Sequence, residues 1–293
     1  MKVFVTGATG FIGTAVVREL LGAGHEVVGL ARSDKGAEAL EAAGAQARRG
    51  TIEDLEGLRE AAREADGVVH LAYIHDFSDR ESAERADRLA TDAIGEALEG
   101  TDKPFVLTSG VLVLEQGRLN TESDPAVGTG RYAEAAVSEL AARGIRSSVV
   151  RLSPTVHGED DHGFVRALVQ IARDKGFSAY VGEGANHWPA VHRLDAARLF
   201  RLALESAPAG SPLHGTAEEG VRFREIAEAI GRGLNLPVRS IAPEEAGAHF
   251  GWLNFAASGD CRASSARTQA LLGWKPEHPN LLADLEAGYY FND

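Results

Sequence analysis

The chain is poor in cysteine and in long apolar runs, and each shortage excludes a class of protein. Among its 293 residues there is one cysteine, Cys261. Because a single cysteine cannot form an internal disulfide, we expect a protein of a reducing compartment, the cytoplasm. Arg18 and Glu19 interrupt the first apolar segment, and no run approaches the length of a membrane span. We therefore expect neither a secretion signal nor a membrane partner.

Basic residues are also in short supply. The 30 lysines and arginines are outnumbered by 43 aspartates and glutamates, which gives a formal net charge of −13. With no basic cluster to offset it, this charge repels phosphate backbones and anionic lipids, so we expect no nucleic-acid partner and no membrane surface. The length, with 44% hydrophobic residues, is enough for one large domain or two closely packed ones.

Glycine is plentiful at the amino terminus, where Gly7, Gly10 and Gly13 are spaced G-x-x-G-x-x-G. A short apolar run, Lys2–Val5, precedes them, and an amphipathic helix and a second strand, Glu26–Ala31, follow. In a βαβ unit this spacing lets backbone N–H groups approach a pyrophosphate, and it predicts dinucleotide binding. The loop residues expected to hold the cofactor are Thr6, Gly7, Thr9, Gly10, Phe11, Ile12 and Gly13.

The end of the second strand selects the cofactor. An acidic residue there accepts from a ribose 2′-hydroxyl, whereas an arginine accommodates a 2′-phosphate. The strand ends with Arg32 and Ser33, and Lys35 lies close by, while Asp34 is expected to cap the following helix. This pattern favours NADP over NAD. The alternative is that Arg32 is only a solvated surface arginine.

Strands and helices alternate through the first half of the chain. Further strands are expected over Gln46–Arg49, Gly67–Ala72, Pro104–Ser109 and Arg146–Leu152. Helices are expected over about Asp34–Ala43, Asp54–Glu64, Asp79–Glu99 and Arg131–Arg143. Such alternation predicts an α/β fold with a doubly wound parallel sheet, the Rossmann arrangement, as a dinucleotide-binding domain over residues 1–155.

Residues 156–293 have fewer expected strands and form a smaller, mostly helical substrate-binding region. Loops are expected at HGEDDHG and VGEGANHWPAVHR, and helices at about Leu194–Glu205, Phe223–Gly231, Pro243–Asn254 and Ser264–Leu272. We expect this region to cap the carboxyl edge of the strands, where ligands of open α/β sheets bind. Residues of about 190–206 are expected to pack back on the main sheet.

Several segments resemble one family along nearly the whole chain. They are TGATGFIG, VVHLA, VLTSG, VVRLSPTVHG and WPAVHRLDAARL. The chain resembles the extended and atypical short-chain dehydrogenases/reductases, often labelled NAD-dependent epimerases/dehydratases. The resemblance implies an NAD(P)-dependent enzyme acting on a small-molecule substrate, as a monomer or a homodimer. Strand ends that border the cofactor in this topology add Leu71, Ala72 and Pro154 to the expected contacts.

The resemblance is incomplete at the catalytic residues. Family members use Ser or Thr, Tyr and Lys, with an Asn on the long helix. Tyr132 falls in the tyrosine region, but the lysine position of Y-x-x-x-K is Ala136, so the tyrosine pKa should stay near its free value of about 10. Ser109 ends the fifth strand, although one alignment places the catalytic position on Gly110. Asp87 stands where the asparagine usually lies.

Polar residues after the strands supply alternatives for the chemistry. His75 or His157 would replace the weakened tyrosine as proton donor, although a loop histidine is more often structural. We expect no metal, since His157 and His162 do not share a helical face and hydride transfer needs none. Trp188 either lines the substrate site or packs in the core. The residues expected around the substrate are Tyr73, Asp76, Asp87, His162, Trp188 and His192.

Two charged positions are expected to be structural. Arg151 lies within an apolar strand, which predicts a buried carboxylate partner. Asp195 is expected to cap the helix that follows it or to pair with Arg193.

Three functions are consistent with these features. The first is an NADP-dependent oxidoreductase that reduces a carbonyl or imine on a small organic molecule. The second is a sugar-nucleotide epimerase or dehydratase, which the lysine-free motif disfavours because such reactions begin with a base. The third is a catalytically silent regulator that senses NADP.

Overall fold

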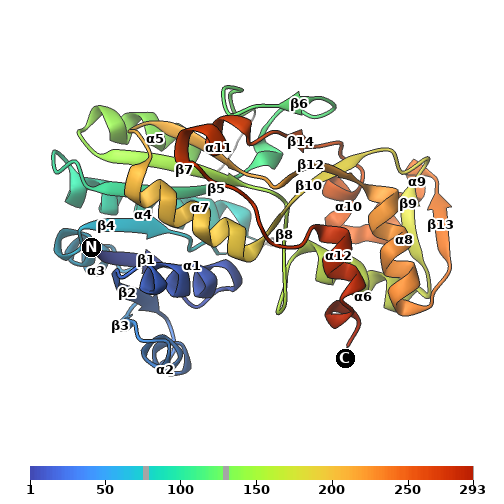
Figure 1. The fold of residues 1–293 in the computed structure, drawn as a ribbon, viewed down its shortest axis with the longest axis horizontal. Coiled ribbons are helices and arrows are strands. Elements are labelled where there is room, and N and C mark those ends of the chain that lie inside the picture. The colour runs from blue at the N-terminus through green and yellow to red at the C-terminus, as the bar shows by residue number, and fades with distance from the viewer. Residues whose placement is uncertain (75–78, 128–131, 293) are drawn as a thin grey trace.

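A seven-stranded parallel sheet forms the centre of the computed structural model, which describes residues 1–74, 79–127 and 132–292 (Figure 1). The strand order is β11-β7-β5-β4-β1-β2-β3. Its strands are β1 (Lys2–Thr6), β2 (Glu26–Ala31), β3 (Gln46–Arg49), β4 (Gly67–His70), β5 (Pro104–Gly110), β7 (Arg146–Leu152) and β11 (Ser211–Gly215). Every pairing in this sheet is parallel, which confirms the expected Rossmann fold.

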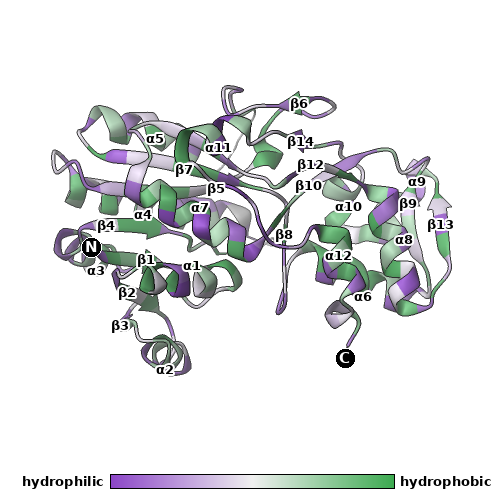
Figure 2. Ribbon diagram, viewed as in Figure 1, coloured by the Kyte–Doolittle hydropathy of each residue, from purple (hydrophilic) through white to green (hydrophobic). Residues whose placement is uncertain are grey.

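Helices cover both faces of this sheet. One face carries α1 (Phe11–Gly22), α2 (Asp34–Ala42) and α7 (Arg193–Ser206). The other carries α3 (Leu55–Glu64), α4 (Arg80–Leu98) and α5 (Tyr132–Ala142). The middle strands β1, β4 and β5 are buried along almost their whole length, because both faces of the sheet are covered. Figure 2 shows this as a hydrophobic band along β4, in contrast to the mixed faces of α7 and α8.

Among the described residues, the C-terminal region has a second core and two small sheets, ordered β12-β10-β8 and β13-β9, and its strand β14 pairs with β6 from the first half of the chain. The strands are β6 (Leu119–Asn120), β8 (Thr155–His157), β9 (Ser178–Val181), β10 (His187–His192), β12 (Glu218–Arg222), β13 (Val238–Ile241) and β14 (Arg262–Ala263). The helices are α6 (Phe164–Lys175), α8 (Phe223–Leu234), α9 (Pro243–Phe250), α10 (Asn254–Ala257), α11 (Ala266–Leu272) and α12 (Leu281–Glu286). Single 3-10 turns are η1 (Val111–Val113), η2 (Gly251–Leu253) and η3 (Tyr289–Phe291).

Strand β10 corrects the sequence reading, which treated HWPAVH as part of a loop. The register against β12 shifts between Trp188 and Ala190, so Pro189 lies at a bulge. A bulge is one of the few places where a sheet tolerates proline, because no ladder hydrogen bond is lost there. The strand therefore continues through the proline as far as His192.

After β10 the chain returns to the main sheet. Leu199 and Phe200 of α7 are buried in the same core cluster as Val3 of β1 and Val16 of α1. Strand β11 then adds an edge to the sheet beside β7. Residues 193–215 thus belong structurally to the dinucleotide-binding half, and β11 is a strand that sequence periodicity missed.

Candidate cofactor and active site

The glycine loop joins β1 to α1 at the carboxyl edge of the sheet. Gly7 has φ +67°, and a Cβ there would lie 2.7 Å from the Ala72 nitrogen. A Cβ on Gly13 would overlap the Gly7 carbonyl oxygen. These two positions therefore need glycine for backbone conformation and close approach.

The mouth of this loop presents hydrogen-bond donors. The first helical bond runs from the Thr14 N–H to the Gly10 carbonyl oxygen, so the N–H groups of residues 11–13 lie ahead of it. Gly10, the N-cap of α1, supplies no side-chain cap, and both Thr9 and Gly10 are exposed. Backbone donors at a positive helix terminus fit a diphosphate. The expected loop residues are thus brought together in a form that suits a dinucleotide.

The segment after β2, where the adenosine part of the cofactor is expected, differs from the sequence-based prediction in one detail. Ser33, not Asp34, caps α2, because the extended Ser33 accepts from the Gly36 N–H at 3.2 Å. Asp34 instead pairs with Arg49, whose Nη2 lies 3.2 Å from the Asp34 carboxylate. Arg49 also donates to the Ala31 carbonyl oxygen at 3.2 Å. Two arginines, Arg32 and Arg49, therefore lie at the ends of β2 and β3, and sequence reasoning missed the second.

A buried network connects the ends of β1 and β4. Thr6 Oγ1 lies 2.7 Å from His70 Nδ1 and accepts from the Ala72 N–H at 3.2 Å. His70 Nε2 lies 3.5 Å from Asp87 on α4. The Asp87 side chain is 2% exposed, so this structure gives it a partner within the fold, and a substrate contact stays a prediction.

Ser109 and Tyr132 lie in different surroundings. Ser109, near the end of β5, is 4% exposed, and its hydroxyl has no hydrogen-bond partner among the described residues. The Tyr132 hydroxyl donates to Asp92 of α4 at 2.7 Å. Burial and this carboxylate together raise the pKa of Tyr132 to about 12. Ala136, one turn later, is buried in the core between α4, α5 and the sheet, where a lysine would have no water.

Tyr132 also borders an open groove of about 940 Å³. Charged side chains of both signs surround it, among them Arg85, Arg88, Asp124, Glu134 and Arg151. Arg151 donates to both carboxylate oxygens of Glu134, at 3.1 and 2.8 Å, which confirms the expected buried partner. None of the described lining residues belongs to the glycine loop.

Three histidines gather where β8, β10 and α12 meet. His157 is fully buried, and its Nδ1 lies 2.6 Å from Asp284 of α12. His192 packs edge-on against His157 at 5.4 Å and stacks on His278 at 4.8 Å. Burial lowers the pKa of His192 to about 4, against an opposing effect of Asp284. The candidates His157 and His192 thus contact each other inside the fold.

His192 also caps α7, since its Nδ1 accepts from the Leu194 N–H at 3.2 Å. The expectation that Asp195 caps this helix or pairs with Arg193 is wrong. Asp195 is buried and accepts from the backbone N–H groups of Glu277 and His278, both at 3.0 Å. A carboxylate inside the first turn can reach a neighbouring segment, which sequence spacing does not reveal.

The remaining candidates have varied positions. Trp188 is 1% exposed, and its indole N–H donates to the Ala256 carbonyl oxygen at 2.8 Å, so it has the core role that the sequence left open. His162 is exposed, whereas Tyr73, Leu71, Ala72 and Pro154 are half-buried. His75 and Asp76 lie outside the described residues. None of the described helices is long and apolar enough to cross a membrane.

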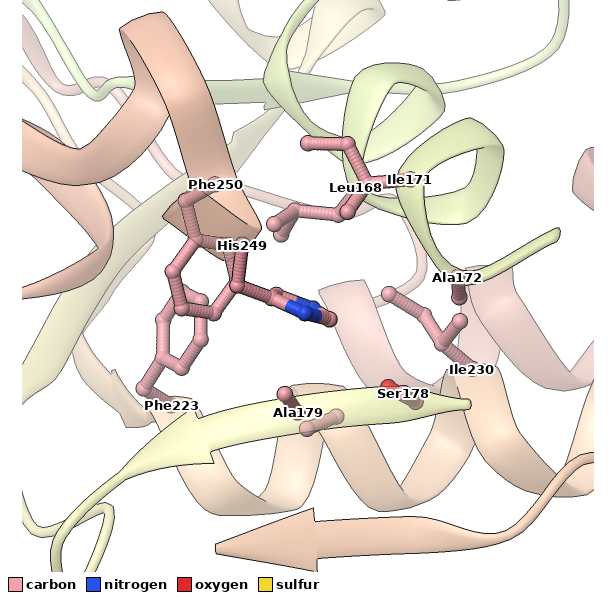
Figure 3. Close-up of a pocket in the computed structure, with 10 residues that line it drawn as sticks. Leu168, Ile171, Ala172, Ser178, Ala179, Phe223, Ile230, His249 and Phe250 are labelled. Carbon is pink, nitrogen blue, oxygen red and sulfur yellow. The ribbon is translucent and has the colours of Figure 1, made fainter. Parts of the chain in front are cut away.

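A small pocket lies inside the C-terminal region, between α6, α8, α9 and β9 (Figure 3). Its volume is about 10 Å³, scarcely room for one water. Figure 3 shows the His249 ring pointing into it among apolar side chains such as Leu168 and Ile230. This pocket is a packing gap in the second core and has no room for a substrate.

Comparisons with known proteins agree with this geometry. An uncharacterized protein of Schizosaccharomyces pombe is 49% identical over 296 residues, covering 99% of this chain and 100% of that protein. One of Saccharomyces cerevisiae is 44% identical over 298 residues, covering both chains fully. A 4-hydroxy-2-methyl-3-oxo-4-farnesyl-3,4-dihydroquinoline-1-oxide ketoreductase of Stigmatella aurantiaca is 28% identical over 268 residues, covering 86% of this chain and 80% of that one.

Among solved structures, UDP-glucose 4-epimerase of Thermotoga maritima, with UDP-glucose, superposes with a TM-score of 0.77. It is 20% identical and covers 99% of this chain and 98% of its own, a likeness that shows the fold alone. The model of the NAD dependent epimerase/dehydratase family, whose members are NAD(P)-dependent oxidoreductases and epimerases, matches residues 3–214. With more than half of its length matched, this chain belongs to the NAD dependent epimerase/dehydratase family.

Proposed function

We propose that this protein is an NADP-dependent reductase acting on a carbonyl or imine carbon of a small organic molecule. The observation that carries the proposal is the pair of arginines beside the glycine loop. Arg32 is exposed at the end of β2, and Arg49 neutralises the nearby Asp34. An acidic residue would accept from a 2′-hydroxyl, but this end of the site has a positive excess that suits a 2′-phosphate.

When bound, NADPH supplies a hydride to the substrate carbon. The chain's own part is to bind and orient it. The loop N–H groups hold the diphosphate, and Leu71, Ala72 and Pro154, at the ends of β4 and β7, border the nicotinamide. Small-molecule substrate enters between this edge and the C-terminal region.

The protonation state of Tyr132 supports reduction over epimerisation. A phenol with a pKa of about 12 stays protonated through the neutral range, so it donates a proton but is a poor base. Reduction of a carbonyl needs a donor, whereas epimerisation and dehydration begin by taking a proton from an alcohol. The ketoreductase of Stigmatella aurantiaca is a relative with the proposed type of reaction.

Three side chains are proposed as donors to the nascent oxyanion or nitrogen. They are Tyr132, Ser109 and His157. The Ser109 hydroxyl is buried without a partner among the described residues, so a substrate oxygen would satisfy it. His157 has Nδ1 held by Asp284, while Nε2 lacks a partner in the described part of the chain. His75 is a fourth candidate.

The test is oxidation of NADPH with a panel of carbonyl and imine compounds. Replacing the donor should lower kcat about a hundredfold with NADPH affinity kept. The variants are Ser109→Ala, His157→Asn, Tyr132→Phe and His75→Asn. Ser148→Ala is the matched control, because Ser148 is another buried hydroxyl without a partner in the described structure, on neighbouring β7. Tight NADPH binding with unchanged turnover in all four variants would contradict the assignment.

A second test addresses the cofactor. Arg32→Ala and Arg49→Ala should each raise the Kd of NADPH about tenfold and leave that of NADH unchanged. Arg48→Ala is the control, since Arg48 pairs with Glu60 on the surface. Equal losses for both cofactors would argue against the 2′-phosphate site.

The alternatives give different results in the same assays. An epimerase or dehydratase recycles its cofactor and would retain the oxidised form through purification. A silent NADP sensor would bind NADPH and reduce no compound of the panel. A cytoplasmic location belongs to the proposal as well. Its support is that the chain has one cysteine, Cys261, which cannot form an internal disulfide.

A further inference from the structure

Helices α1 and α7 lie side by side on one face of the sheet (Figure 1). Two contacts fix their alignment. Arg201 Nε lies 2.7 Å from Glu19, and the Arg193 guanidinium carbon lies 5.1 Å from the centre of the Phe11 ring. The Glu19–Arg201 contact lies about two turns after the Phe11–Arg193 contact along both helices, so the helices are parallel. Their N-termini therefore lie together at the glycine loop.

Arg193 and Arg201 differ in their partners. Arg201 is paired with Glu19 and also with Glu205, at 2.9 Å. Arg193 makes no ion pair with any carboxylate of the part of the chain that the structure describes. Two other half-buried arginines without a carboxylate in the described structure, Arg146 and Arg166, donate instead to backbone carbonyl oxygens. Within the described residues the Arg193 guanidinium has neither kind of acceptor and contacts only an aromatic ring, so it is available for an anion.

The methylene chain of Arg193 is also fixed by close packing against Gly158. Gly158, just after β8, has φ +141°, and a Cβ there would come 3.2 Å from Arg193 Cγ. The methylene chain thus passes over a residue without a side chain, and the guanidinium rests on Phe11. Phe11 is the first residue of α1, directly after the N-cap Gly10. A cation is thereby placed against the side chain of Phe11, whose own N–H is one of those ahead of the first helical hydrogen bond.

We infer that Arg193 binds the diphosphate of the dinucleotide, an inference that rests on the proposed function. The loop N–H groups and the two helix termini supply only partial charges, whereas a guanidinium supplies a full charge and paired donors that match phosphate oxygens. The diphosphate is the counter-ion that Arg193 lacks. Arg193 directly follows β10. The diphosphate site therefore includes a residue from the segment that returns from the C-terminal region to the main sheet.

The experiment measures the affinity of the full-length protein for three ligands by calorimetry or competition. NADP contains both the diphosphate and the 2′-phosphate. ADP-ribose contains only the diphosphate, and adenosine 2′-monophosphate contains only the 2′-phosphate. Arg193→Met, which keeps the methylene packing, should raise the Kd of NADP and ADP-ribose about tenfold or more. It should leave adenosine 2′-monophosphate unchanged, and Arg193→Lys should recover part of the affinity.

Arg32→Ala should show the opposite selectivity, with weaker binding of NADP and adenosine 2′-monophosphate and unchanged binding of ADP-ribose. Arg201→Met is the matched control, from the same face of the same helix, and should bind all three ligands as wild type does. Circular dichroism confirms that each variant is folded.

Three results would overturn the inference, and they are distinguishable. If the wild type binds NADP but Arg193→Met binds NADP and ADP-ribose equally well, the inference alone is wrong. If the wild type binds neither NADP nor NAD, the proposed function is wrong too. A loss of affinity for all three ligands in a folded Arg193→Met variant would also overturn the inference, because it shows no selectivity for the diphosphate.

Discussion

The glycine loop and the histidine cluster both gather polar groups, but they do so in opposite ways. At the loop, the N–H groups of residues 11–13 precede the first helical hydrogen bond, and the side chain of Arg32 is exposed. In the cluster, His157 Nδ1 pairs with Asp284 and His192 Nδ1 caps α7, while His157 Nε2 has no partner among the described residues. Polar groups left open at a surface suit a ligand, whereas polar groups satisfied by neighbouring segments hold those segments together.

The contrast shows how the two halves of the site are built. The expected cofactor contacts come mainly from backbone at one turn, so they would be available before any ligand arrives. Tyr132, expected to be catalytic, and Asp87, expected near the substrate, instead have partners on other elements. Any role that they play in the reaction must compete with those partners, and substitutions can separate the two uses.

The largest loss of stability is expected when the buried Arg151 loses its carboxylate partner, Glu134. Both carboxylate oxygens of Glu134 accept from Arg151, and the two side chains are 9% and 5% exposed. Glu134→Ala leaves a buried positive charge with weaker partners and should lower the free energy of unfolding by about 3 to 5 kcal/mol, measured in urea. Glu139→Ala, at an exposed site of the same helix, is the control. Equal stability of the two variants would contradict a structural ion pair.

Adding a methyl group at Gly13, at the glycine loop, should lower the stability somewhat less than the loss of Glu134 but should abolish cofactor binding. Gly13→Ala places a methyl group against the Gly7 carbonyl oxygen, so the loop must shift. We expect a loss of about 1 to 3 kcal/mol in unfolding free energy and loss of detectable NADPH binding. Gly22→Ala, at the end of the same helix with no atom near the new methyl group, should be neutral or slightly stabilising. Unimpaired NADPH binding by Gly13→Ala would show that the loop is not the cofactor site.

The histidine cluster should make stability depend on pH. Burial lowers the pKa of His192 to about 4, although Asp284 opposes this shift. The unfolded chain therefore takes up a proton near pH 6.5 that the folded chain refuses, and stability falls as the pH drops from about 6.5 to 4. We expect the free energy of unfolding to fall by about 2 kcal/mol over this pH range. His192→Asn can still cap α7 but cannot titrate, so it should flatten this profile.

His162→Asn, at an exposed histidine, is the control for the pH profile. Stability curves of His192→Asn and wild type that run parallel between pH 4 and 6.5 would show that His192 is not the group that titrates.

The smallest effect is expected at the cap of α2. Ser33 accepts from the Gly36 N–H, so Ser33→Ala should destabilise the protein by about 1 kcal/mol. Asp34→Asn should have little effect, because its carboxylate is 91% exposed and only meets Arg49 at the surface. Thermal denaturation of both variants decides between the two caps. A larger loss of stability for Asp34→Asn than for Ser33→Ala would indicate that Asp34 caps α2, as the sequence predicted.

Sequence periodicity was a good guide to the elements with local causes. Helix α7, expected at about Leu194–Glu205 and found at Arg193–Ser206, follows from apolar spacing. The third strand, Gln46–Arg49, lies where it was expected, although its QARR sequence has a single apolar residue. Strand β10 was missed because its proline reads locally as a break, and only the pairing with β12 and β8 reveals the bulge. Strand β11 was missed because it is short and depends on β7 for its hydrogen bonds.

The sequence by itself determined the glycine loop, the parallel sheet and the positive residue Arg32, because these depend on neighbours within one βαβ unit. Only the tertiary structure decided that Arg49 meets Asp34, that Arg193 rests on Phe11 and that His157 meets Asp284. Each of these pairs joins segments that are distant along the chain. Their contact depends on how the helices and sheets pack, and no local pattern of residues encodes that packing.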